Sequence, residues 1–301
     1  MSWECPHQTG DESTCERRGL PCKPLESGCV LCGKVTFVGI EEKERSMKTP
    51  NDSLTPRANI QPDQTVAETV LRYPQLREKL EQLGVDYCCG GKRSLADAVQ
   101  RARLDLAEVV RALEQALDQP RAAATDWTAA SVTALAEHIL DTHHVFTKAQ
   151  LPRIAALLAK VQRAHSLHHG AMLAALRSAF EPLRAELEAH LSKEEQILFP
   201  AIIAIDGYLA GRNARPQVHC GSVAHPIRQM EFEHDGAGAA LARMRELTQD
   251  YQLPDDACET FKALYAALSA LEVDLHEHIH LENNVLFPAS VAQEQRIGAP
   301  T

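Results

Sequence analysis

Hydrophobic residues recur at intervals of three and four from residue 128 onward, the spacing of one face of an α-helix. The pattern predicts four long helices: residues 128–164, residues 171–205, one from about Pro226 and one from Asp255 or Asp256. Pro152 is expected to bend or split the first helix. Because apolar stripes face inward, the four helices predict a bundle, and the fold class is all-α.

A smaller helical domain is predicted ahead of the bundle, over residues 59–120, with the bundle occupying 121–301. Its first helical segment runs from residue 64 to a cap at Gly84, and Pro74 is expected to break or kink it. Ser94 is expected to begin a further helix, and another starts at Asp105. Between them, residues 86–91 form a loop whose two glycines permit positive φ or close backbone approach.

That loop contains the adjacent cysteines Cys88 and Cys89. One interpretation is that they pack as small apolar groups. Another is that they act as redox, metal-binding or transfer thiols, since a disulfide between neighbouring residues is strained and easily reduced. The composition alone does not decide between the two interpretations.

Residues 1–58 are rich in glycine, proline, serine, threonine and charge, and predict a cysteine-containing extension with little or no order. Cys15, Cys22, Cys29 and Cys32 provide the ligands of a four-thiolate metal site, but no predicted hairpin surrounds them and the pattern does not favour the site. A further hypothesis is that Met47 is the true start, because residues 39–44 can be encoded by a purine-rich run resembling a ribosome-binding site.

Composition narrows the class of protein. A net charge of −10 argues against binding to nucleic acid, and no apolar run is long enough to cross a membrane. The chain lacks a basic-then-apolar leader, so a cytoplasmic protein is expected. Its unusual side chains are nine cysteines and fourteen histidines, and thirteen of the histidines lie from His138 onward. An odd cysteine count in that setting argues against a disulfide framework.

An internal repeat lies within the predicted bundle. His190 is followed by Glu194 at i+4 and by Leu-Phe-Pro-Ala at 198–201, and His278 is followed by Glu282 and by Leu-Phe-Pro-Ala at 286–289. On a helix, residues i and i+4 project from the same face. A single such pair is weak evidence, whereas two copies in register predict a common function.

A histidine on the preceding helix accompanies each copy: His144 lies 46 residues before His190, and His234 lies 44 before His278. Buried carboxylates are costly unless a cation compensates them. The predicted metal ligands are therefore His144, His190, Glu194, His234, His278 and Glu282. Two carboxylates able to bridge favour two metal ions, with iron preferred over manganese and zinc.

The remaining histidines are expected to play lesser parts. His138, His143, His165, His276 and His280 either support the ligand imidazoles from outside or lie exposed, and exposure is favoured. His168, His169, His219 and His225 are expected in loops, together with Cys220, and residues 206–224 in a long surface loop. Cys258 is expected in the core or at a helix cap.

The motifs together resemble the Repair of Iron Centres family, bacterial iron–sulfur cluster repair di-iron proteins. The resemblance covers residues 60–292 and rests on Asp86-Tyr-Cys-Cys-Gly-Gly-Lys, on His143-His144, on Glu233-His234-Asp235 and on both copies of the repeat. It implies a hemerythrin-like four-helix bundle behind the small domain. It also implies a non-haem di-iron centre on the same six residues, bridged by oxo and by both glutamates.

The resemblance further implies a function in repairing iron–sulfur clusters damaged by nitrosative or oxidative stress, by donation of iron. Cys88 and Cys89 would then be redox or transfer thiols. The implied partners are damaged cluster proteins, with nitric oxide or oxygen as small ligands and a homodimer as the assembly. An iron donor is expected rather than a classical enzyme. The alternatives are a hemerythrin-like carrier or sensor of oxygen or nitric oxide, and a di-iron nitric oxide reductase or peroxidase.

Overall fold

The computed structural model describes residues 14–15, 20–21, 60–118, 125–217 and 221–298. The chain separates into two units, Met1–Thr55 and Pro56–Thr301. In the first unit, strands β1 (Thr14–Cys15) and β2 (Leu20–Pro21) pair antiparallel, with Cys15 opposite Leu20. The expectation that no hairpin surrounds Cys15 is therefore wrong, because these two strands pair with each other. The hypotheses on Cys22, Cys29, Cys32 and Met47 lie outside the described residues.

Local sequence signals set the helix ends in the small domain of the second unit. Helix α1 (Val66–Arg72) begins after Thr65, which exchanges hydrogen bonds with Glu68 in a reciprocal capping box. Pro74 interrupts the helical segment, as predicted, and begins the 3-10 helix η1 (Pro74–Leu76), which leads into α2 (Arg77–Gln82). Gly84 has φ +67°, the left-handed conformation that ends a helix.

Two further helices complete the small domain at the predicted positions. Helix α3 (Leu95–Arg101) begins after Ser94, and α4 (Leu106–Leu117) begins after Asp105. Each capping side chain accepts a hydrogen bond from the backbone N–H three residues later. The apolar faces of these helices enclose a core that also includes Ile279 from the bundle. The small domain therefore shares part of its core with the bundle.

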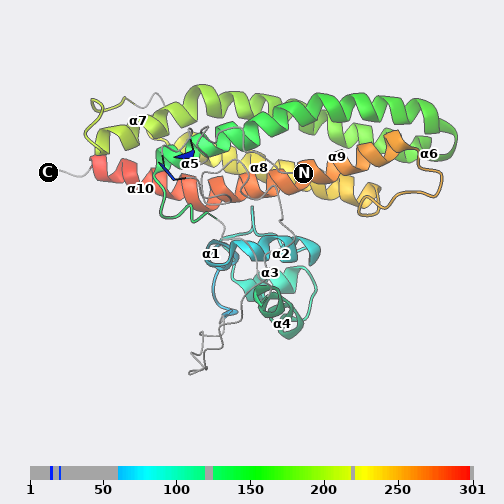
Figure 1. The fold of residues 1–301 in the computed structure, drawn as a ribbon, viewed down its shortest axis with the longest axis horizontal. Coiled ribbons are helices and arrows are strands. Elements are labelled where there is room, and N and C mark those ends of the chain that lie inside the picture. The colour runs from blue at the N-terminus through cyan, green and yellow to red at the C-terminus, as the bar shows by residue number, and fades with distance from the viewer. Residues whose placement is uncertain (1–13, 16–19, 22–59, 119–124, 218–220, 299–301) are drawn as a thin grey trace. The chain divides into compact units, whose positions relative to one another are not determined.

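The first two predicted bundle helices form a hairpin. One consists of α5 (Val132–Ile139), the π-helical turn η2 (Leu140–His144) and the first part of α6 (Val145–Lys193). The other consists of the rest of α6, the π-helical turn η3 (Glu194–Leu198) and α7 (Phe199–Leu209). The backbone of His165 is non-helical, with φ −116° and ψ 20°. Arg177 donates to the Gln162 side chain at 3.3 Å, although a straight helix would separate them by about 22 Å, so the chain reverses near His165 (Figure 1).

Pro152 lies inside α6 and does not split it, so of the two expected effects, a bend or a split, the split is not observed. A proline removes a single backbone hydrogen bond, here to the carbonyl of Lys148. Leu151 and Ile154 on either side of Pro152 are fully buried, and their packing keeps the helix continuous.

The third and fourth bundle helices also lie close to their predicted positions. They are α8 (Ala224–Leu247) and the continuous series α9 (Glu259–Leu281), η4 (Glu282–Leu286) and α10 (Phe287–Gly298). Because α7 extends to Leu209, the connection predicted at 206–224 is shorter than expected, and His225 lies in α8 rather than in a loop. Across the described ranges, no helix combines the length and apolarity needed to cross a bilayer.

Two of the π-helical turns coincide with the sequence repeat. Turn η3 ends just before Phe199-Pro200, and η4 ends just before Phe287-Pro288. A proline cannot donate the regular backbone hydrogen bond and its ring crowds the carbonyl four residues earlier. A widened turn relieves that crowding, and such turns are frequent at functional sites. The Leu-Phe-Pro repeat therefore favours a local widening of both helices, in turns that begin at Glu194 and at Glu282.

Two apolar cores lie along the bundle, one on each side of a polar layer. Leu187, Ala237 and Leu275 belong to the first core. Leu198, Met230 and Leu286 belong to the second. Between them on the same helices lie His190, Glu194, His234, His278 and Glu282, all buried. The bundle is thus held by apolar packing at both ends of a central layer that carries the site.

Replacing Gly84 by alanine is expected to destabilise the small domain by about 1 kcal/mol, because its left-handed backbone strains any residue with a Cβ. Gly236, inside α8, is a matched control, since a Cβ meets no atom within 4 Å at either position. Gly236→Ala should stabilise the protein by roughly 0.5–1 kcal/mol. Urea unfolding of both variants tests this prediction, and shifts of the same sign would contradict it.

Candidate metal centre

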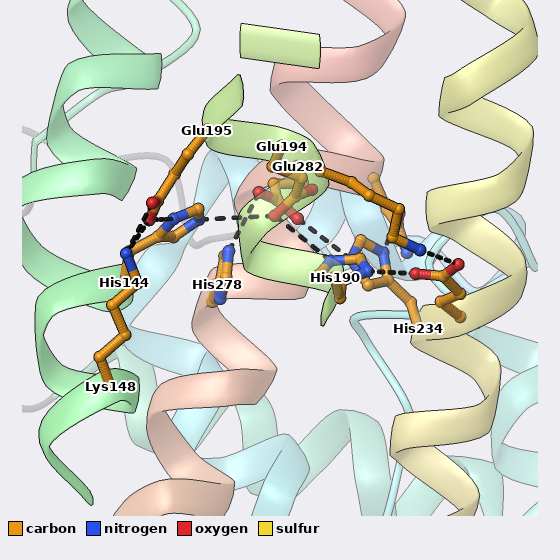
Figure 2. Close-up of polar contacts among 11 residues, drawn as sticks. His144, Lys148, His190, Glu194, Glu195, His234, His278 and Glu282 are labelled. Carbon is orange, nitrogen blue, oxygen red and sulfur yellow. Dashed lines mark hydrogen bonds and ion pairs between the residues drawn. The ribbon is translucent and has the colours of Figure 1, made fainter. Parts of the chain in front are cut away.

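The six residues singled out by the repeat meet in one buried cluster (Figure 2). Two groups present ligand atoms within 4.8 Å of one another. His144 and His278 belong to one group, and His190 and His234 to the other. Glu194 and Glu282 belong to both. The structure therefore brings together all the predicted ligands, with two histidines on each side of a shared carboxylate pair.

The Nε2 atoms of the four imidazoles face the two carboxylates. His144 and His190 lie 3.5 and 3.3 Å from Glu194 Oε2. His234 and His278 lie 3.1 and 3.0 Å from the oxygens of Glu282. The Nε2 atoms of His190 and His234 are 3.1 Å apart. Two nitrogens about 2.1 Å from one metal and at right angles would be about 3 Å apart, so this spacing fits a shared ion.

Three of the four imidazoles are held from outside the cluster by an acceptor for Nδ1–H. His144 donates to Glu195 at 2.8 Å, and His190 donates to Glu233 at 2.8 Å. His234 donates to the amide oxygen of Asn283 at 2.9 Å. With Nδ1 as the donor, a ring that is neutral, as a metal ligand must be, directs the lone pair of Nε2 toward the carboxylates. Without an ion, burial acts to lower the pKa of His190, but the facing glutamates outweigh it and raise the pKa to about 9.

Lysines keep both outer glutamates ionised. Burial raises the pKa of Glu233, but hydrogen bonds from Lys193, Gln229 and His190 outweigh it and lower the pKa to about 2. Burial of Glu195 is likewise outweighed, by Lys148 and His144, and its pKa lies below the ordinary value. Each half of the site therefore contains a chain of lysine, glutamate and histidine, of which Lys148, Glu195 and His144 are labelled in Figure 2.

The central carboxylates carry unmet bonding capacity. Within the described part of the chain, both oxygens of Glu194, Oε2 of Glu282 and Nε2 of His144 are buried without a hydrogen-bond partner. Burial and the charge of Glu282 act to raise the pKa of Glu194, and the facing imidazoles of His144 and His190 outweigh them. Two charged carboxylates with open lone pairs fit a cation, which compensates their desolvation. The residues present therefore fit a metal centre.

Sequence patterns alone missed the outer partners. The expectation assigned that role to histidines, whereas the structure assigns it to Glu195, Glu233 and Asn283. Each of these is the immediate neighbour of a predicted ligand but supports a ligand on another helix. The sequence shows that each of these residues is adjacent to a predicted ligand. It does not show which imidazole the residue meets, because helix packing determines that contact.

Two other histidines are buried although exposure was favoured. His143 bonds Asp274 at 3.0 Å, and its ring stacks on that of His278 with centroids 5.5 Å apart. His280 is 2 % exposed and lies 3.1 Å from the Asn284 amide. The expectation of exposure is wrong for both, because the packed bundle encloses the turns beside the ligands. His138, His165 and His276 are partly buried.

The cysteine loop lies directly against the cluster. Cys89 Sγ is 3.6 Å from the carbonyl oxygen of His234, and the Asn284 amide donates to the Cys88 carbonyl at 3.2 Å. A Cβ on Gly91 would lie 2.5 Å from the Asn284 side chain, so close approach explains this glycine. Cys88 is buried, as the packing interpretation expected, whereas Cys89 is partly exposed.

Removing the carboxylate of Glu233 tests the outer shell of the site. Glu233→Ala is expected to lower the affinity of the cluster for a divalent metal about 10–100-fold, because His190 loses the acceptor that orients it. Glu188→Ala is the matched control, since Glu188 lies on α6 and pairs with Arg184 at the surface. Equal affinities in competition with a chelator would contradict the prediction.

The chain matches known families over both helical regions. Residues 135–290 match the Hemerythrin HHE cation binding domain. Residues 62–117 match ScdA_N, a domain of unknown function (DUF542).

Curated relatives match over most of the chain. An iron–sulfur cluster repair protein YtfE from Pectobacterium carotovorum subsp. carotovorum (strain PC1) is 36 % identical over 236 residues, 77 % of this chain and 98 % of the relative. The YtfE proteins of Citrobacter koseri and Salmonella schwarzengrund are 36 % and 37 % identical, with the same shares covered. The predicted all-helical fold, with a hemerythrin domain behind a small helical domain, is confirmed. The chain belongs to the YtfE family of iron–sulfur cluster repair proteins.

Proposed function

We propose that the buried cluster holds two iron ions. The observation that carries this proposal is the pair of ligand groups that share Glu194 and Glu282. His144 and His278 would hold one ion and His190 and His234 the other, and Glu194 and Glu282 would be shared between them. Imidazole and carboxylate together suit iron, and pairs of glutamates with histidines are the ligands of di-iron bundles. Bound iron supplies exchangeable coordination positions and redox chemistry.

Side chains around the site increase the basicity of the ligand imidazoles. Glu195 and Glu233 accept Nδ1–H of His144 and His190 and increase the electron density at Nε2. Lys148 and Lys193 hold these glutamates ionised. The outer glutamates and their lysines lie closer to solvent than the fully buried Glu194 and Glu282. Displacement of these glutamates from the imidazoles would weaken the hold on the metal, while the apolar cores on either side keep the bundle folded.

We further propose that the protein restores damaged iron–sulfur clusters by donating iron, in the cytoplasm. Support comes from the relatives that are named iron–sulfur cluster repair proteins and from the dithiol loop beside the site. Acceptors would be cluster proteins that have lost iron. In this process the iron is cargo, and a donor must hold it firmly yet release it.

Cys88 and Cys89 are the proposed transfer thiols. Their sulfurs are 3.8 Å apart, and Asp86 with both thiols presents ligand atoms within 4.8 Å of one another. A hydrogen bond to Cys89, together with burial, raises the pKa of Cys88, so this thiol is protonated in the absence of metal. Iron passing to the loop would exchange imidazole and carboxylate ligands for thiolates, and each thiol that binds releases its proton. No change of oxidation state is needed.

A hollow beside the loop gives this route access to the outside. The cavity has a volume of about 740 Å³ and its lining includes both thiols, Asp86 and Asp235, together with Glu272, which is paired with Arg245. Acidic side chains next to a dithiol favour passage of a cation.

A carrier or sensor of oxygen or nitric oxide is the second candidate function. A narrow cavity of about 20 Å³ is lined by His190, His234 and His278 and by apolar side chains such as Leu187. That space suits one water-sized molecule beside the metal centre. Reversible gas binding without transfer of iron to an acceptor would favour this candidate.

Loss of both central carboxylates should abolish iron binding. The wild-type protein is expected to bind about two irons per chain, one for each ligand group. A Glu194→Ala, Glu282→Ala variant should bind close to none, because both groups lose their shared ligands. A variant with Glu181→Ala and Glu246→Ala removes two surface charges and should keep both irons. Full iron content in the first variant would contradict the bridging assignment.

Iron transfer to an apo-ferredoxin in the presence of sulfide tests the function. Wild-type protein should restore the visible absorption of the ferredoxin cluster. Cys88→Ser, Cys89→Ser should retain its iron but transfer it several-fold more slowly, since hydroxyl groups are poor iron ligands. Glu188→Ala serves again as the control for surface substitution. If the serine variant transfers iron at the wild-type rate, the thiols take no part in the transfer.

A further inference from the structure

A second cluster of metal-binding side chains lies at the end of the bundle where α6 reverses. His165 and His169 come from the reversal itself, and Asp256 comes from the turn that precedes α9. All three present ligand atoms within 4.8 Å of one another. His169 is separated from His190 by 21 residues of α6, about 30 Å along the helix, so this cluster is distinct from the central site.

The donor atoms of this cluster converge on one carboxylate. His169 Nε2 is 2.8 Å from Asp256 Oδ1, and His165 Nδ1 is 3.9 Å from Asp256 Oδ2. The two imidazoles approach different oxygens of Asp256, so they do not compete for the same carboxylate oxygen. An ion bound by both rings and the carboxylate would have two nitrogens and one oxygen as protein ligands.

The surrounding structure fixes both rings. The backbone at His165 leaves the helical conformation, which turns this side chain toward the start of α9. His165 and His169 both meet the buried ring of Phe261 edge to face, with centroids 5.1 and 5.7 Å away. A ring held by packing loses less freedom when it binds an ion.

Cys258 holds the remaining nitrogen of His165. The two atoms, Cys258 Sγ and His165 Nε2, are 3.2 Å apart. Cys258 is exposed and occupies the N-cap of α9, where its side chain makes no capping hydrogen bond, so the core alternative is wrong and the thiol faces the histidine instead. With the sulfur of Cys258 accepting from Nε2–H, the lone pair of His165 lies on Nδ1, the nitrogen that faces Asp256.

The three side chains of the cluster differ in their exposure to solvent, and an ion can reach the site from outside. The side chains of His165 and His169 are 11 % and 23 % exposed, and that of Asp256 is 48 % exposed. The imidazoles are thus partly sheltered while the carboxylate remains accessible to solvent. His168, the neighbour of His169, is exposed and does not belong to the cluster.

We propose that His165, His169 and Asp256 form a second metal site, which binds one divalent ion of the zinc class. Two imidazoles and one carboxylate are zinc ligands, and three protein ligands leave a coordination position for water. Cys258 acts as a positioning residue through His165. The ion would connect the reversal of α6 to the start of α9, which are separated by about ninety residues of sequence, and stabilise that end of the bundle. This inference does not depend on the proposed function of the central cluster.

The experiment compares two double variants of the full chain, each loaded with iron and then equilibrated with zinc. His169→Ala, Asp256→Asn removes two proposed ligands. His168→Ala, Asp255→Asn makes the same chemical changes at the adjacent exposed positions and is the matched control. Iron and zinc per chain are measured together, so that zinc that displaces iron from the central cluster is recognised.

The control variant is expected to bind one more zinc per chain than the ligand variant, with equal iron in both. Both double variants keep all the cysteines, so zinc bound by other cysteines is the same in each and does not affect the difference between them. Cys258→Ser should keep the stoichiometry but weaken zinc binding about tenfold, as loss of an outer partner does. Equal zinc content in the two double variants would overturn the site, and an unchanged zinc affinity in Cys258→Ser would overturn the positioning role of the thiol.

Discussion

The arrangement of the bundle depends on two carboxylates buried where water cannot reach them. Glu194 and Glu282 are 0 % exposed, and they lie between two apolar cores that cannot compensate their charge. An uncompensated pair at this depth would be strongly destabilising. Four imidazoles and the proposed metal ions offset that cost. The helices must therefore deliver six side chains to one layer, and the regular packing on either side holds them there.

The support for this layer comes from the helices around it rather than from the helix that bears each ligand. Glu195 on η3 holds His144 on η2, Glu233 on α8 holds His190 on α6, and Asn283 on η4 holds His234 on α8. Each hydrogen bond fixes an imidazole and also ties two helices together. A change in one ligand helix is thus transmitted to a ligand on its neighbour.

The cysteine loop shares this network. Asn283, which orients His234, also lies 3.5 Å from the Cys88 carbonyl, and Asn284 donates to the same oxygen. The small domain and the bundle are further linked by ion pairs of Lys92 with Glu231 and of Arg77 with Glu277. A loop whose backbone bonds to the residues that hold the ligands is well placed to respond to the state of the site. These hydrogen bonds support the proposed role of the adjacent thiols in the release of iron.

The sequence by itself determined the helices, their order and the six residues of the central cluster, because apolar periodicity and the His–Glu repeat are local patterns. It also located the caps at Ser94 and Asp105, whose hydrogen bonds reach only three residues. Only the tertiary structure decided which acceptor meets each imidazole, that His143 and His280 are buried, and that His165 and His169 meet Asp256. These contacts join residues far apart in the chain, and their geometry follows from helix packing and from the reversal of α6, which no local pattern encodes.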